Sequence, residues 1–370
     1  MSLRCLFVVV WVVSETLASA QTPTPTSTPM KFVNPWVSVA QPNIPADPLE
    51  VAGDADPVQD VARRATAIKL LSNAQFLSNV RRGSYDLKTH FISSQGNWQV
   101  EDSSPGRNIY RWAVQGPSYS AVNLFLDQVI YSNQPATGIP LRVAQVHSAI
   151  FAHSPTLGPR AALRTVNGNL NGTQVTCVLV SNLFNVQPVG GPRRWEEYES
   201  CVDPKSGLLM SYSPVPGMYV LYDYSNAQRL RNIIFPGKFT ITEAGQTVVE
   251  AQVVSLTQPA NADASIYAPA SLNALGVGFP LTQPWRVQDI NFVGKPNPNA
   301  TSGQFVVVRG MVSPDGSLTD TEVLASSDPG LNQKALERAA QPRRMMPQDD
   351  QNGATPQSHE AFFTTLFVTN

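Results

Sequence analysis

The residues with the clearest potential for acid–base chemistry are Glu197 and Glu199, which lie two positions apart in a stretch with the character of a β-strand. Because side chains alternate along a strand, both carboxylates would project from one face. A carboxylate held close to a second one has a raised pKa and can act as an acid. Arg193 and Arg194 lie beside the pair and would neutralise it. We therefore expect a solvated or neutralised pair, and no acid catalysis here.

Metal-binding and nucleophilic chemistry have no recognisable pattern in the sequence. The histidines are His90, His147, His153 and His359. None lies at a ligand spacing from another on one helix. The Gly-x-Ser-x-Gly turn of hydrolases and the glycine-rich phosphate loops do not occur in the sequence. We expect no catalytic residue, no metal and no cofactor, and hence no enzyme.

The N-terminus is typical of a secretory leader. Arg4 precedes an unbroken apolar run from Leu6 to Val13, and Ala18-Ser19-Ala20 matches a cleavage site. Glu15 ends the run well short of the roughly 20 apolar residues that span a bilayer. We expect cleavage after Ala20 and a periplasmic or secreted protein. If the leader is not cleaved, an inner-membrane anchor is the alternative.

Export determines which cysteines remain in the mature protein and places them in an oxidising compartment. Removal of the leader takes Cys5 away and leaves Cys177 and Cys201. An even pair of cysteines in an oxidising compartment favours a disulfide. Position 189 lies midway between them, in a loop rich in Pro and Gly, so a hairpin would place the two cysteines opposite each other. We expect a structural Cys177–Cys201 disulfide; the alternative is two separate core thiols.

The charge balance excludes nucleic acid from the expected partners. Lys and Arg together number 26, Asp and Glu 27, and the formal net charge is −1. Nucleic-acid binding requires a basic footprint, which this balance does not provide. The 370 residues are 42% hydrophobic, which is enough to build the cores of about two domains.

The sequence predicts that the segments that position the carboxylates and cysteines are mostly antiparallel strands. Alternating apolar and polar residues, separated by turns, predict a series of strands that begins with residues 84–91. Asp56-Pro57 predicts the start of a helix that reaches about residue 80. Apolar spacing predicts two further helices, over residues 122–129 and 141–151.

The last seventy residues carry the most specific pattern. Residues 305–312 predict an apolar strand, and Ser313-Pro314-Asp315-Gly316 has the composition of a type I turn. Residues 318–325 predict the returning strand, and Asp328-Pro329 predicts the start of a helix. The chain ends with a strand over residues 361–368 that is rich in Phe and Thr.

This order of strand, turn, strand, helix and strand resembles the C-terminal domain of TonB-like energy transducers. The motifs that carry the resemblance are Val308–Gly316 and Ser326–Leu331. The resemblance implies an envelope partner whose peptide adds as a strand to an exposed sheet edge. The final strand would be that edge. Its partner-binding residues would be Phe362, Thr364, Leu366 and Val368.

The middle region is similar in layout to the LolA/LolB-like family of periplasmic lipoprotein carriers. The layout is a curved antiparallel sheet with helices packed on one side, and Glu199–Leu209 resembles a hairpin of exported proteins that join such a domain to a TonB-like tail. This resemblance implies a lipid or a lipidated protein on the concave face of the sheet. The aromatic residues that would line this face are Tyr85, Phe91, Trp112 and Trp195, and the alternative is that they form core.

We therefore expect an α+β chain with a curved antiparallel sheet and a small TonB-like ββαβ domain. The expected order is a signal peptide (1–20), a Pro/Thr-rich linker (21–55), the sheet domain (56–270), a second linker (271–300) and the tail domain (301–370). The expected function is non-enzymatic binding of envelope proteins, outer-membrane receptors among them, by strand addition to the tail. The alternative is a periplasmic carrier of lipid or lipidated protein. The sequence does not reveal the oligomeric state.

Overall fold

The structure is a computed structural model, and its description covers most of the chain beyond residue 55. The described residues are 56–58, 61–74, 83–106, 109–126, 129–134, 139–151, 157, 161–182, 193–259, 263–272, 275–277, 285–293, 303–313, 315–341 and 358–369. The predicted signal peptide (1–20) and first linker (21–55) lie outside them. None of the described helices has the length and apolar character needed to cross a membrane.

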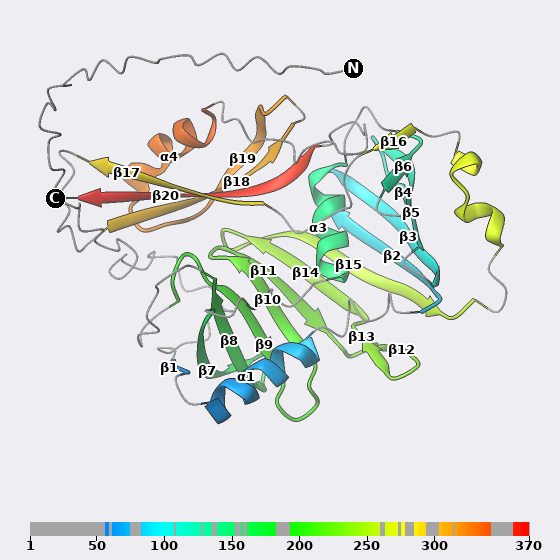
Figure 1. Cartoon of the computed structure of the whole chain (residues 1–370), viewed down its shortest axis with the longest axis horizontal. Coiled ribbons are helices and arrows are strands. Elements are labelled where there is room, and N and C mark those ends of the chain that lie inside the picture. Colours follow the sequence, from blue (N-terminus) through cyan, green and yellow to red (C-terminus); the bar gives the residue numbers. More distant parts are fainter. Residues whose placement is uncertain are drawn as a thin grey trace, which may run out of the picture.

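Within these residues, fourteen strands form one curved sheet in which every neighbouring pair is antiparallel (Figure 1). In order of pairing, they are β1 (Asp56–Pro57), β7 (Ala162–Leu170), β8 (Thr173–Ser181), β9 (Tyr198–Val202), β10 (Leu209–Val215), β11 (Met218–Asp223), β14 (Lys238–Glu243), β15 (Gln246–Thr257), β2 (Tyr85–Ser93), β3 (Gly96–Gly106), β4 (Ile109–Gln115), β5 (Ser120–Leu126), β6 (Val129–Ser132) and β16 (Leu275–Val277). A separate hairpin consists of β12 (Gln228–Leu230) and β13 (Ile233–Phe235).

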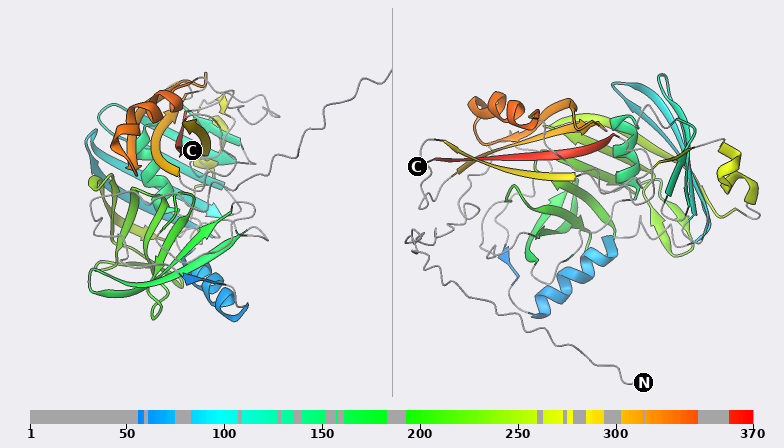
Figure 2. Two further views of the ribbon diagram at one scale, coloured as in Figure 1. Left: turned by 90° about the vertical axis from the view of Figure 1, so that its left-hand side faces the viewer. Right: turned by 45° about the horizontal axis from the view of Figure 1, so that its top comes forward.

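A second, four-stranded sheet contains the end of the chain. Its strands pair in the order β17 (Trp285–Val293), β20 (His359–Thr369), β18 (Gly303–Val312) and β19 (Leu318–Ser326). The helices are α1 (Val61–Ala74), α3 (Leu141–Ile150) and α4 (Asn332–Ala339), with short 3-10 turns at η3 (Ala264–Tyr267), η4 (Pro269–Leu272) and η5 (Pro329–Leu331). The C-terminal sheet lies beside the large sheet, with α4 on its far side (Figures 1 and 2).

Local sequence explains the hairpins of the large sheet. The β7–β8 turn has Asn171 and Gly172 at φ 49° and 84°, and the β14–β15 turn has Ala244 and Gly245 at 48° and 78°. Two consecutive residues with positive φ are typical of the type I′ turn, whose twist matches that of paired strands. Along β3 the side chains of alternate residues are buried, from Trp98 onward, as expected of a strand with one covered face.

The helices α1 and α3 and the C-terminal sheet all cover the same face of the large sheet, which we name the inner face. Val178, Ser200, Tyr212 and Val220 form one row across β8, β9, β10 and β11. Val178 packs in the cluster that contains the buried residues of α1. Val220 packs in the cluster that contains the residues of α3 and of the C-terminal sheet. Much of the apolar core therefore lies between the inner face and these three covering elements. A smaller buried cluster, which contains Cys177, Cys201 and Tyr219, lies on the opposite face.

The last strand, β20, buries both of its own faces. Phe362 and Leu366 belong to the apolar cluster of the inner face, together with Trp98 and Phe239 of the large sheet. Phe363 and Phe367 point the other way and pack in the cluster that contains α4. The C-terminal sheet is therefore a layer between α4 and the large sheet, and its core is continuous with that of the rest of the protein.

The prediction that the final strand forms an exposed edge of its sheet is wrong. β20 is hydrogen-bonded to β17 on one side, in parallel register, and to β18 on the other, in antiparallel register. Its backbone groups are thus already paired along both edges, and the outer strands of this sheet are β17 and β19. The small sheet with one helix exists in the expected order β18, β19, α4 and β20. Its likeness to a TonB domain stays a prediction.

Other elements also differ from the sequence analysis. The stretch predicted as a linker (271–300) contains β16 and β17, one in each sheet. The predicted helix over 122–129 is instead part of the β5–β6 hairpin, where Phe125 pairs with Ile130. Asp56-Pro57 forms the short strand β1, and α1 begins at Val61. The predicted helix over 141–151 is confirmed as α3.

The contact between the two sheets can be tested at Gly217. Gly217 and Gly172 have nearly equal φ angles of 85° and 84°. A Cβ atom at Gly217 would lie 2.1 Å from the carbonyl oxygen of Leu324 in β19, whereas nothing lies within 4 Å of one at Gly172. We expect Gly172→Ala to lower the free energy of unfolding by roughly 1–2 kcal/mol, through the left-handed backbone alone.

Gly217→Ala should cost about 1–3 kcal/mol more than this control, because the added methyl group forces the β10–β11 turn away from β19. Urea denaturation of both full-length variants measures the difference. Equal destabilisation of the two variants would show that the sheets do not meet at this turn.

Candidate ligand-binding face of the large sheet

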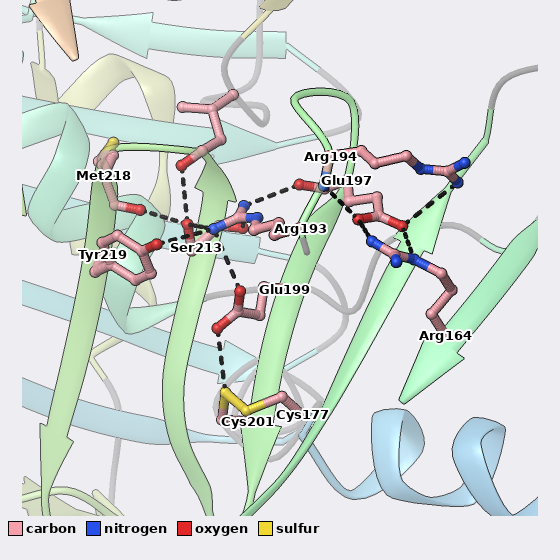
Figure 3. Close-up of polar contacts among 11 residues, drawn as sticks. Arg164, Cys177, Arg193, Arg194, Glu197, Glu199, Cys201, Ser213, Met218 and Tyr219 are labelled. Atoms are coloured by element: carbon pink, nitrogen blue, oxygen red, sulfur yellow. Dashed lines mark hydrogen bonds and ion pairs between the residues drawn. A yellow bond between two sulfur atoms is a disulfide. The ribbon is translucent and has the colours of Figure 1, made fainter. Parts of the chain in front are cut away.

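Arginines neutralise the predicted carboxylate pair. Both oxygens of Glu197 accept hydrogen bonds from Arg164, at 2.7 Å from Nε and 2.5 Å from Nη2 (Figure 3). Arg193 Nη1 lies 3.4 Å from Glu199 Oε2 and donates to Ser213 Oγ at 2.7 Å. Glu197 precedes β9 rather than lying in it. All four of these charged side chains are buried, so we assign them to structure rather than to proton transfer.

Glu196 extends this ion-pair cluster. Its Oε1 lies 3.0 Å from Arg194 Nε, and the side chain is almost fully buried. Burial raises the pKa of Glu196 to about 7, although the Arg194 charge opposes the shift. A carboxyl with such a pKa is a common feature of active sites. Here it is bound to an arginine within a buried cluster, and we assign it to the same structural unit.

The expected disulfide is confirmed. Cys177 and Cys201 are directly opposite in β8 and β9 and are joined by an S–S bond of 1.98 Å. With Glu199 the two sulfur atoms form a group whose possible metal-ligand atoms lie within 4.8 Å. Because the sulfur atoms are bonded to each other, neither offers the thiolate that a metal would need. The bridge closes a loop with a sequence separation of 24, which stabilises the fold by about 3 kcal/mol.

The four aromatic residues expected to line the concave face are all buried in the inner-face cluster. Tyr85, Phe91, Trp112 and Trp195 are each no more than 3% exposed. Their rings are therefore packed core, as in the alternative interpretation.

A row of polar residues nevertheless crosses this apolar face. Pairing across neighbouring strands aligns Asp102 of β3 with Trp112 of β4, Asn123 of β5 and Ser132 of β6. All four side chains are buried. Polar groups are costly on a buried face unless they find partners. The row therefore marks a position where the sheet does more than form core.

Helix α3 covers one end of this polar row. His147 Nε2 lies 3.4 Å from Asp102 Oδ2, and the His147 ring stands edge-on to Trp112 with ring centroids 5.1 Å apart. The Tyr85 hydroxyl donates a hydrogen bond to Asp102 Oδ1. Tyrosine, aspartate, histidine and tryptophan thus meet between β2, β3, β4 and α3, inside the protein.

The next two groups of the row lack partners. Trp112 Nε1 has no hydrogen-bond acceptor, and neither the oxygen nor the nitrogen of the Asn123 amide has a partner, within the residues that the structure describes. Burial raises the pKa of the neighbouring Tyr119 hydroxyl to about 12, and Asn123 moderates this shift. The geometry of these two side chains is nevertheless not that of a hydrogen bond. Buried polar groups of folded proteins are normally satisfied by protein, water or ligand.

The residues predicted to bind a partner strand lie elsewhere. Phe362, Thr364 and Leu366 are buried on the side of β20 that faces the large sheet, and for Val368 only the backbone is described. The side chains expected on the partner-binding edge strand thus contact this chain's own large sheet.

Sequence reasoning missed Asp102, Asn123 and the role of His147. The available signal was a polar residue at an inward position of an alternating strand, which applies to Asp102 and Asn123. Asn123 was missed because residues 122–129 were predicted as a helix rather than as a strand. The partnership of His147 with Asp102 depends on the packing of α3 on β3, which no local pattern specifies.

No protein-family model and no curated protein sequence matches this chain. Among solved structures, a LolA superfamily protein from Nitrosomonas europaea matches at 10% identity with a TM-score of 0.36, covering 55% of this chain and 97% of that protein. A DUF1329 family protein from Desulfovibrio piger matches at 10% identity with a TM-score of 0.38, covering 59% and 99%.

A chain of the MucA/MucB complex of Pseudomonas aeruginosa matches at 16% identity with a TM-score of 0.27, covering 65% of this chain and 69% of that one. Because these TM-scores are low, we infer the function from the geometry of this chain alone.

The structural role of the ion-pair cluster can be tested by removing one charge. Glu197→Gln leaves the buried Arg164 guanidinium without its carboxylate, which should lower the free energy of unfolding by about 3–5 kcal/mol. The control is Glu101→Gln, because Glu101 pairs with Lys88 at 3.1 Å while about half of each side chain is exposed. That change should cost less than about 1 kcal/mol. Urea denaturation in which the two variants lose equal stability would contradict the assignment.

Proposed function

We propose that this chain is an exported binding protein that carries an amphiphile, a lipid or the lipid of a lipidated protein, on the inner face of its large sheet. The observation that carries the proposal is the buried Trp112 Nε1, which has no acceptor among the described residues, beside the buried Asn123 amide, whose polar neighbour is the Tyr119 hydroxyl. Ligand sites of this kind combine apolar walls with a few polar groups that fix the ligand's orientation.

The available polar groups favour an uncharged oxygen on the ligand. Trp112 Nε1 can only donate, whereas the Asn123 amide can both donate and accept. The nearest ionisable partners in the row, Asp102 and His147, already face each other. A buried phosphate or carboxylate would lack a countercharge here and would be costly. The ester or amide carbonyl of an acyl chain fits these donors, and its hydrocarbon fits the surrounding apolar side chains.

The covering elements place a requirement on ligand access. Helix α3 contacts the polar row directly, and the C-terminal sheet packs on the inner face beside it. An acyl chain therefore reaches the row only when α3 or the C-terminal sheet moves away from the large sheet. A carrier needs such a cover, because the ligand must be shielded from water during transport.

Docking of a partner strand on β20 is not supported, because β17 and β18 occupy both edges of that strand. The face that carries Phe362 and Leu366 packs on the large sheet. These contacts favour the C-terminal sheet as a cover of the inner face rather than as an independent docking module.

A direct test is to identify what the protein carries. We expect mass spectrometry of an organic extract of the purified full-length protein to find acyl lipid. After this lipid has been removed, a fluorescent diacylglycerol should bind to the protein saturably. Trp112→Phe should weaken this binding about 3- to 10-fold, as the loss of one hydrogen bond predicts.

The matched control is Trp195→Phe, an equally buried tryptophan that precedes β9, a strand that six other strands separate from β4 in the sheet. It should change affinity less than about twofold. A lipid-free extract together with no saturable binding would overturn the proposal. Equal effects of the two substitutions would show that the ligand does not bind at Trp112 and Asn123.

A further inference from the structure

A second buried polar cluster joins α3, the large sheet and the C-terminal sheet at one point. The Gln145 side chain of α3 donates to Glu243 Oε1 of β14 at 2.6 Å and to Glu360 Oε1 of β20 at 2.7 Å. All three side chains are no more than 4% exposed. One amide group thus bridges two carboxylates that come from the two sheets.

Two arginines complete the cluster. Arg142 of α3 lies 2.7 Å from Glu243 Oε2 and donates to Gln145 Oε1 at 2.8 Å. Arg309 of β18 lies 3.1 Å from Glu243 Oε1, and its far end binds the partly exposed Glu322 of β19. The charged groups around Glu360 are therefore Arg142, Glu243 and Arg309.

The negative charge of Glu360 has fewer direct contacts with positive groups than that of Glu243. Both arginines bind Glu243 directly, and Arg309 is shared further with Glu322. The contact found for Glu360 within the described residues is the one from Gln145. Burial raises the pKa of Glu360 to about 7, and the Glu243 charge adds to the shift, while Gln145, Arg309 and Arg142 oppose it.

The sign of the pH effect follows from this shift. If the sheets separate, Glu360 becomes solvated and its pKa returns toward the ordinary glutamate value of 4.5. The closed form then binds the proton more tightly than the open form. Closure is favoured fully in acid, loses its advantage as the pH rises from about 4.5, and reaches its weakest level above about 7.

We infer that Gln145, Glu243, Glu360, Arg142 and Arg309 form a proton-controlled latch that holds α3 and the C-terminal sheet over the inner face, tight in acid and loose at neutral to alkaline pH. The inference rests on the proposed function in so far as the inner face is the ligand site. The geometry couples latch and site through one helix. Gln145 of α3 lies in the latch, and His147, two residues on, contacts Trp112 of the polar row.

Hydroxyl-radical footprinting of the full-length, ligand-free protein tests the latch, because separation of the two sheets exposes inner-face side chains while β20 stays paired with β17 and β18. Protection of Phe362 and Leu366 from oxidation should fall on the order of tenfold between about pH 5.5 and 8, levelling off above about pH 7. The β7–β8 hairpin, which β9, β10 and β11 separate from β14 in the sheet, serves as the internal reference. Glu360→Gln mimics the protonated carboxyl and should keep protection high and constant with pH. The control Glu337→Gln, on the exposed side of α4, should behave like the unchanged protein.

A flat or rising profile of the unchanged protein would overturn the latch, as would a Glu360→Gln variant with the same pH dependence. Should that variant fail to fold, the profile of the unchanged protein alone decides. Because no ligand is used, a failure here leaves the proposed function standing. If protection depends on pH as expected but the protein neither contains nor binds lipid, the proposed function is overturned and the latch is supported.

Discussion

The C-terminal strand β20 has to bury both of its faces, and the arrangement of the two sheets depends on this requirement. One face, with Phe362 and Leu366, joins the core of the large sheet, and the other, with Phe363 and Phe367, joins α4. A strand with two apolar faces is typical of the middle of a layered structure rather than of its edge. The C-terminal sheet therefore acts as a cover that belongs to the same folded unit as the large sheet.

Helix α3 reaches two clusters of polar groups within this interior. Buried charges and amides are costly unless they are paired, so each cluster needs a structural or functional reason. The cluster around Glu243 pairs its charges across the two sheets and fixes how the cover sits. The row through Trp112 and Asn123 contains polar atoms with no hydrogen-bond partner among the described residues, and these are the groups to which the proposed function assigns the ligand. Movement of α3 would alter both clusters together.

Local patterns predicted more of the fold than of the site. Alternation and turn residues predicted a series of antiparallel strands that begins with β2, and the midpoint of the hairpin predicted the Cys177–Cys201 disulfide, because these depend on local sequence. Other strands of the large sheet, β3 and β14 among them, were missed. The helix over 122–129 was wrong because four apolar residues at helical spacing also suit a twisted hairpin, and β-sheet pairing decided the outcome. The edge position of β20 was wrong because β17 comes from a stretch predicted as linker. The meeting of Gln145 with Glu360, 215 positions apart, depends on tertiary packing that no local pattern carries.

The most direct test of lipid carriage on the inner face is to find where a bound acyl chain lies. A diacylglycerol with a photoreactive diazirine in its acyl chain would be bound to the full-length protein, irradiated and mapped by mass spectrometry of the digested chain. We expect cross-links in residues 109–126 and 141–150, the strands of the polar row and the helix that covers it. Cross-links confined to exposed segments such as the outer side of α1, or a pattern equal to that of the denatured protein, would contradict a ligand site on this face.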